Sequence, residues 1–151
     1  MTCKVSYSRR RGTTAIEFGI ACPIVFFVFF AIIVGGLGVF RYQQVASAAR
    51  EGARWASVHG ADYARETNLP AATAADIYNT AILPAASALD PGMLSYSVTW
   101  NQTNEPLRVT NDVEKPTGNT VTVTVSYQWF PELILVGPYA LSSTSTAQML
   151  Y

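Results

Sequence analysis

The dominant hydrophobic feature of the chain is an uncharged run from Phe18 to Phe40, which begins directly after Glu17. At about 1.5 Å per residue, a helix over these roughly 23 residues is about 35 Å long, which is enough to cross the hydrocarbon core of a bilayer. Apolar stretches in the helices of soluble cores seldom exceed about 14 uninterrupted residues. The pattern therefore predicts a membrane-spanning helix over about residues 18–40.

A secretory signal peptide is the alternative interpretation of this run. The apolar region of a signal peptide has about 7–15 residues and ends at a small-residue cleavage site. The run found here is longer and follows an acidic residue. We therefore favour a membrane span that is retained.

Small and apolar residues continue the helical pattern beyond the span. After Arg41 they recur at spacings of three and four, at Val45, Ala49, Gly52, Ala53 and Ala56. One long helix over about residues 13–58 is therefore predicted, with Gly60 as its stop. We expect this small-residue stripe to pack against the rest of an outer domain, and a contact with another subunit is the alternative.

Three further stretches predict the elements of that outer domain. A second helix is expected over about residues 71–89, with Pro84 as an interruption. Alternation of apolar and polar residues predicts strands at 94–100 (LSYSVTW) and 120–129 (TVTVTVSYQW), and weaker alternation predicts a third strand at 141–149. The predicted fold class is α+β: a long N-terminal transmembrane helix that continues into a small ectodomain with a second helix and a three-stranded antiparallel sheet.

The connections between the strands have different characters. Residues 101–119 are rich in turn formers and form a longer link than a hairpin needs. Residues 133–136 are apolar and lie between Pro131 and Pro138. We expect this apolar loop to be tucked under the sheet, and an exposed contact patch is the alternative.

Composition agrees with this plan. Of the 151 residues, 50% are apolar and 13% are charged, as expected for one small domain attached to one membrane helix. We divide the chain into a basic leader at 1–12, a long helix at 13–60 and an extracytoplasmic α+β domain at 61–151. Cys3 and Cys22 fall in the leader and the span, so the outer domain must be held together by packing rather than by a disulfide.

Charge is distributed unevenly along the chain. Lys4, Arg9, Arg10 and Arg11 precede the span with no acid among them, so we expect the N-terminus in the cytoplasm and the C-terminus outside. Residues 13–151 carry six basic and ten acidic side chains, which gives a formal charge of −4. This acidic balance argues against a nucleic-acid partner.

The start of the chain also carries a recognisable motif. Residues 9–18 read RRRGTTAIEF, and this order of basic cluster, glycine, four residues, glutamate and apolar helix resembles the processing site of type IV prepilins. Together with Pro23 and AAREGAR at 48–54, it resembles the TadE-like pseudopilins of the Tad (Flp, tight-adherence) pilus system. The resemblance is dense over residues 9–57 and only architectural beyond residue 60.

The resemblance implies a function and a set of partners. A prepilin peptidase would cut between Gly12 and Thr13, leaving a minor pilin or pseudopilin in the inner (cytoplasmic) membrane that serves the assembly of an adhesive pilus. Its partners would be the membrane, the peptidase, other pilin or pseudopilin subunits and the Tad assembly platform. Many major pilins carry an aromatic residue where this chain has Thr13, so the resemblance implies cleavage more strongly than N-methylation.

Glu17 would become the fifth residue of the cleaved chain. A carboxylate at the edge of the hydrocarbon is costly unless it is neutralised or paired. The resemblance implies that its partner is the freed amino group of Thr13 in a neighbouring subunit, which would fix the stagger between helices. The alternative is that Glu17 lies among lipid headgroups near Arg9, Arg10 and Arg11.

Two features of the span concern helix packing. Pro23 removes a backbone donor, so we expect a kink or a loosened turn there. Ala31 and Gly35 form a small-xxx-small pair, extended by Gly36 and Gly38, through which another helix could approach closely. The alternative is that glycine is simply common in membrane helices.

Residues with catalytic potential are sparse. The sequence contains one histidine, His59, and no metalloprotease, nucleophile-elbow or phosphate-loop motif. We interpret His59 as a solvated helix end and expect no enzyme activity, no cofactor and no metal. Two alternatives to a Tad-type pseudopilin stay open: an uncleaved single-span envelope protein with an extracytoplasmic binding domain, and a pseudopilin of a secretion or competence system.

Overall fold

The computed structural model describes residues 11–101, 119–131 and 137–150. Arg9 and Arg10, most of the 101–119 connection and the apolar loop at 133–136 lie outside these ranges, so what was predicted for them stays a prediction. The chain forms two compact units, Met1–Leu37 and Gly38–Tyr151, which are described separately.

Helix α1 (Arg11–Val58) is one continuous α-helix of 48 residues. It includes Pro23 in its interior, and the predicted kink there stays a prediction. Within the described residues, α1 contains one stretch that is long and apolar enough to cross a membrane. Its large apolar side chains are mostly exposed, whereas the helix of a soluble core buries them. This exposure favours the predicted span over a core helix.

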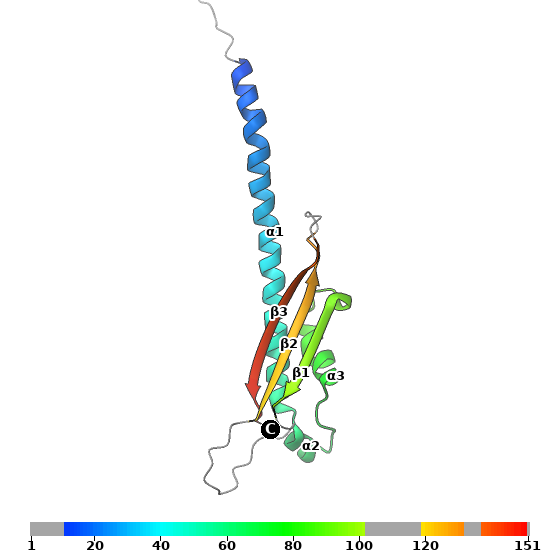
Figure 1. The fold of residues 1–151 in the computed structure, drawn as a ribbon. Helices are drawn as coiled ribbons and strands as arrows, with labels where there is room; N and C mark the ends of the chain where they lie inside the picture. Colours follow the sequence, from blue (N-terminus) through cyan, green and yellow to red (C-terminus); the bar gives the residue numbers. More distant parts are fainter. Residues whose placement is uncertain (1–10, 102–118, 132–136, 151) are drawn as a thin grey trace, which may run out of the picture. The chain divides into compact units, whose positions relative to one another are not determined.

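The unit Gly38–Tyr151 is built on the predicted three-stranded antiparallel sheet (Figure 1). Its strands are β1 (Leu94–Trp100), β2 (Thr120–Trp129) and β3 (Tyr139–Gln148), in the order β1-β2-β3. The third strand begins two residues earlier than predicted because Tyr139 and Ala140 still pair with Trp129 and Gln128. Met149 follows the strand and is buried.

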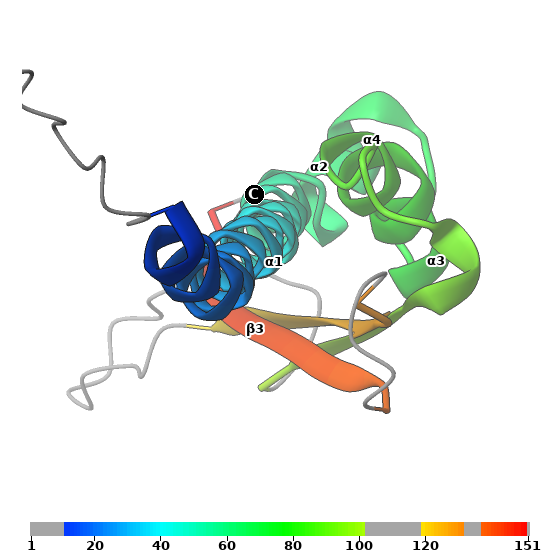
Figure 2. The ribbon, with the colours of Figure 1, turned by 90° about the horizontal axis from the view of Figure 1, so that it is seen from above.

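One face of the sheet is covered by helices, and none of the described helices lies on the other face, as Figure 2 shows. Alternate residues of β2 from Val121 to Trp129 are buried on the covered face. On the open face hydroxyl groups pair across β2 and β3, as in the 2.9 Å contact between Thr124 and Thr144. The alternation of apolar and polar residues that predicted the strands thus gives the sheet one buried face and one polar face.

The second half of α1 lies along β2 in the opposite direction. Three neighbouring pairs follow one another along both elements: Gly52 with Val123, Arg41 with Tyr127, and Gly38 with Trp129. From Gly38 to Gly52 the helix rises by about 21 Å, and from Val123 to Trp129 the strand rises by about 20 Å. The three contacts therefore span about the same length along the helix and along the strand. Every residue of the predicted small-residue stripe is buried.

The segment between α1 and β1 is mostly helical. It contains α2 (Ala61–Thr67), α3 (Ala74–Ile77), a π-helical turn η1 (Tyr78–Ile82), α4 (Leu83–Ala85) and a 3₁₀ turn η2 (Pro91–Met93). Thr73 caps α3 in a reciprocal pair: its hydroxyl accepts from the Asp76 N–H at 3.3 Å, and the Asp76 carboxylate accepts from the Thr73 N–H at 3.0 Å.

Two details of this segment differ from the sequence prediction. Pro84 does not interrupt the helical segment at its own position, because it follows a π turn and lies inside α4. In the π turn the Leu83 N–H donates to the Tyr78 carbonyl, five residues back instead of four. Gly60 has a φ of −83° and is the N-cap of α2. It therefore does not stop α1 in a left-handed conformation, and α2 was not predicted.

Candidate functional site: the N-terminal helix and the outer pocket

The predicted processing site lies in the terminal turn of α1. Gly12 is the second residue of the helix, and no described residue lies within 4 Å of the position that a Cβ would take. The first turn of a helix has unpaired N–H groups and is the part most easily unwound. Glu17 lies about 7.5 Å further along the axis and is exposed. Within the described part of the chain, no hydrogen bond or ion pair involves Glu17.

The predicted packing residues lie on open surface. Pro23, Ala31 and Gly35 are exposed, and nothing in the described chain approaches within 4 Å of a Cβ built at Gly35 or Gly36. The fold does not bring these residues together with Glu17, which lies about two turns before Pro23 and about five turns before Gly35. They are separate positions along one helix whose surface is free for lipid or for another helix.

Gly38 differs from the other glycines of the span. A Cβ at this position would lie 2.7 Å from Cζ3 and 2.9 Å from Cη2 of Trp129, which is itself buried. One turn later, the Arg41 guanidinium donates to the Tyr127 hydroxyl at 3.1 Å. Gly38 therefore permits close packing with the chain's own sheet, whereas the sequence grouped it with residues for an intermolecular contact.

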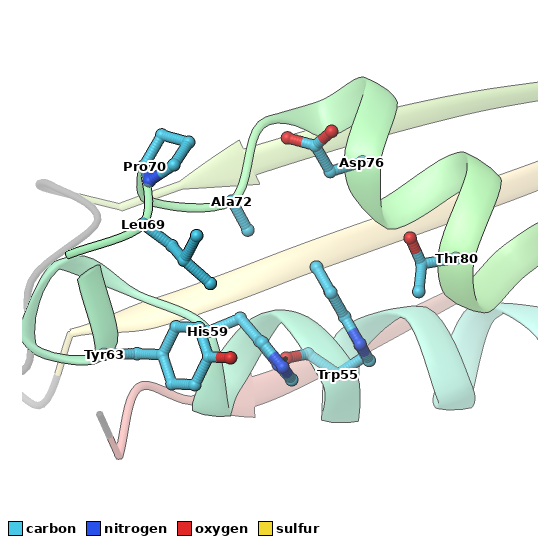
Figure 3. Close-up of a pocket in the computed structure, with 8 residues that line it drawn as sticks. All are labelled: Trp55, His59, Tyr63, Leu69, Pro70, Ala72, Asp76 and Thr80. Atoms are coloured by element: carbon cyan, nitrogen blue, oxygen red, sulfur yellow. Dashed lines mark hydrogen bonds between the residues drawn. The ribbon is translucent and has the colours of Figure 1, made fainter. Parts of the chain in front are cut away.

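The unit Gly38–Tyr151 contains an open pocket of about 390 Å³ at the C-terminal end of α1 (Figure 3). Three rings form one wall: His59 stacks on Trp55 with ring centroids 4.0 Å apart and lies 4.6 Å from Tyr63. His59 Nδ1 is 2.9 Å from the Trp55 carbonyl oxygen. His59, which we interpreted as a solvated helix end, lies directly after α1, half-buried between aromatic rings, and lines the open pocket.

Asp76 lies on the other side of this pocket, and its carboxylate is engaged by Thr73. These hydrogen bonds, the one from the hydroxyl first and the one from the backbone N–H second, hold the pKa of Asp76 below its usual value. In the described ranges, no group of three or more His, Cys, Asp and Glu side chains is placed to hold a metal ion. The pocket is therefore lined by aromatic rings on one side and by Asp76, which belongs to the N-terminal cap of α3, on the other.

Along α1 the chain therefore presents a terminal glycine, an exposed glutamate, an exposed apolar stretch and a buried small-residue stripe, in that order. Residues 12–54 match the family of TadE-like proteins. The match confirms the resemblance that the motif predicted. No curated protein and no solved structure matches the chain.

The TadE-like match covers Glu17, Pro23 and the small-residue pair of the span, and it stops one residue before Trp55. The sheet and the aromatic pocket lie outside it. TadE-like proteins are structural, pseudopilin-type components associated with the Tad pilus, so the similarity implies a component of this kind.

Sequence reasoning missed one feature of the TadE-like segment, its junction with the sheet. Gly38 lies near the C-terminal end of the uncharged run and Arg41 directly follows it, and their partners are Trp129 and Tyr127 on β2. The sequence contains only a weak signal for this junction, namely that both partners belong to the alternating apolar face of β2. Nothing in that alternation identifies the helix turn against which they pack.

Proposed function

We propose that this chain is a minor pilin or pseudopilin of a Tad-type adhesive pilus, made as a precursor and cut between Gly12 and Thr13. It is anchored in the cytoplasmic membrane by α1, with its N-terminus in the cytoplasm and the unit Gly38–Tyr151 outside. The proposal is carried by the TadE-like match over residues 12–54. The role is structural, and the chain is the substrate of a peptidase.

The exposed apolar surface of α1 supports the anchor. Large side chains such as Phe18, Phe27 and Ile32 are 70%, 75% and 68% exposed. A soluble protein rarely exposes a contiguous patch of this size, because the apolar surface costs free energy in water. Lipid chains or neighbouring apolar helices remove that cost. The basic residues Arg9, Arg10 and Arg11 support the orientation.

Glu17 has a defined task in this proposal. Cleavage frees an amino group at Thr13, about 6 Å along the helix from Glu17. A pair between Glu17 of one subunit and the Thr13 amino group of the next satisfies a carboxylate that is costly to leave alone near hydrocarbon. Because the attraction is stronger where water is scarce, it sets an axial offset between neighbouring helices of about 6 Å, adjusted by the reach of the side chain.

Processing is tested first, by intact mass and N-terminal sequencing of the chain from its native membrane, with and without the prepilin peptidase. We expect a peptidase-dependent chain that begins at Thr13. Gly12→Leu should block the cut, whereas Gly19→Ala, at another exposed glycine of α1 with open space around it, should leave it unchanged. A native chain that retains residues 1–12 would support the uncleaved envelope protein instead.

Assembly is tested with Glu17→Gln, which keeps the shape of the side chain and removes its charge. We expect normal cleavage but reduced recovery of the protein in sheared pili or in complexes with other subunits. Glu66→Gln is the control, because Glu66 is an exposed glutamate outside both the predicted span and the TadE-like match. Equal recovery of the two variants would contradict the assembly role of Glu17.

A further inference from the structure

We propose that one end of the sheet rests on the outer surface of the lipid bilayer. This membrane-facing end is formed by Trp129, Phe130 and Tyr139, where β2 ends and β3 begins. The proposal goes beyond the pilus function, and it rests on the part of that function in which α1 spans the membrane. The partner is the headgroup and upper acyl region of a phospholipid bilayer.

The depth of this end follows from its contact with α1. The Trp129 ring lies against Gly38, so closely that a Cβ there would approach the ring to 2.7 Å. Gly38 belongs to the last turn of the uncharged run, which ends at Phe40. When the run spans the bilayer, Gly38 lies within about 3 Å of the outer edge of the hydrocarbon. Trp129 is then fixed at the outer interface by packing within one compact unit.

The chemistry of the membrane-facing end suits this depth. Trp129 and Tyr139 are paired in the sheet with ring centroids 6.3 Å apart. Phe130 is 54% exposed and Tyr139 is 48% exposed, although aromatic side chains are costly to leave in water. Tyrosine is enriched where membrane meets water, because its ring is amphipathic. Trp129 itself is buried against Gly38, and the bilayer surface covers the Phe130 and Tyr139 rings, which the described part of the chain leaves exposed.

Charge and aromatic residues on α1 continue the same band. Arg41 follows the uncharged run directly, and its guanidinium donates to the Tyr127 hydroxyl. Phe40 and Tyr42 beside it are exposed. A long basic side chain at the end of a membrane helix extends its charge to the headgroups while its stem stays on apolar surface. The turn from Phe40 to Tyr42 and the membrane-facing end thus present the residue types of one interface.

The experiment uses the full chain in phosphatidylcholine vesicles, in which a fraction of the lipids carries bromine on the acyl-chain carbons nearest the glycerol. The reporter variant keeps Trp129 and replaces Trp55 and Trp100 with phenylalanine. The control variant keeps only Trp55, which lies about 25 Å further along α1 than Gly38. A third variant adds Phe130→Trp to the reporter, so that an exposed indole at the same end is measured as well.

We expect bromine to remove roughly half of the emission of the Trp129 reporter and of the Phe130→Trp variant, and to leave Trp55 almost unchanged, because only the first two lie at the interface. Flotation of the vesicles tests the anchor in the same samples. Chain that floats with the vesicles but shows equal quenching of all variants overturns the surface contact alone. Chain that does not float overturns both the surface contact and the membrane anchor.

Discussion

Replacement of Gly52 by alanine tests the packing of α1 on the sheet. A Cβ at this position would lie 2.9 Å from Cγ1 of Ile82 and 3.2 Å from Cγ1 of Val123. Both neighbours are fully buried, and both are β-branched residues whose side chains are stiff at χ1. Either the helix or its neighbours must move, so close packing is lost on both sides.

The expected magnitude is a balance of two effects. Overpacking of a filled core costs about 1–3 kcal/mol, whereas alanine is favoured over glycine inside a helix by about 1 kcal/mol. We therefore expect Gly52→Ala to lower the free energy of unfolding by about 1 kcal/mol, which corresponds to a fall of roughly 4 °C in Tm. Near-UV circular dichroism in detergent measures this change in Tm, because all three tryptophans lie in the unit Gly38–Tyr151.

Two variants separate overpacking from other causes. Gly36→Ala makes the same change in the same helix, at a position where no described residue lies within 4 Å of the new Cβ, so it should not lower the Tm. In an Ile82→Ala background the clashing Cγ1 is absent and a cavity is present, so Gly52→Ala should be neutral or stabilising there. A rise in Tm on Gly52→Ala alone, or the same loss in both backgrounds, would refute the reasoning.

Three other substitutions test contacts within the unit Gly38–Tyr151. Gly38→Ala should displace the Trp129 ring, because the new Cβ would lie 2.7 Å from it, and should alter the near-UV signal that Gly36→Ala leaves intact. The pKa of Asp76 lies below its usual value because Thr73 donates to the carboxylate. The contribution of Asp76 to folding stability is therefore complete above the ordinary carboxyl pKa, and it is lost as the pH falls through the lowered pKa of the folded state. The Tm difference between the wild type and Asp76→Ala should shrink in acid, and a difference that is independent of pH would contradict this assignment. Thr124→Val removes an exposed cross-strand hydroxyl pair and should change the free energy of unfolding by less than about 0.5 kcal/mol, as measured by chemical denaturation.

The pattern of the sequence determined the elements and the faces that they bury. The uncharged run and the stripe from Val45 to Ala56 indicated one long helix, and alternation indicated three strands with one wet face; all are present. Periodicity is informative here because it reports the direction in which each side chain leaves its own element. The motif from Gly12 to Glu17 likewise needed no fold, since its residues are consecutive.

Only the tertiary structure decided which residues of different elements contact each other within the unit Gly38–Tyr151. Gly38 and Trp129 are far apart in the sequence, and their contact depends on how α1 and β2 stay in step over about 20 Å. The π turn before Pro84 also depends on the surroundings, because Ala81 and Ile82 within it are buried against other elements. A one-dimensional pattern specifies the face that an element buries, whereas the depth and register of each contact are set by packing between elements. The depth at which the sheet meets the end of the apolar helix is therefore a property of the fold.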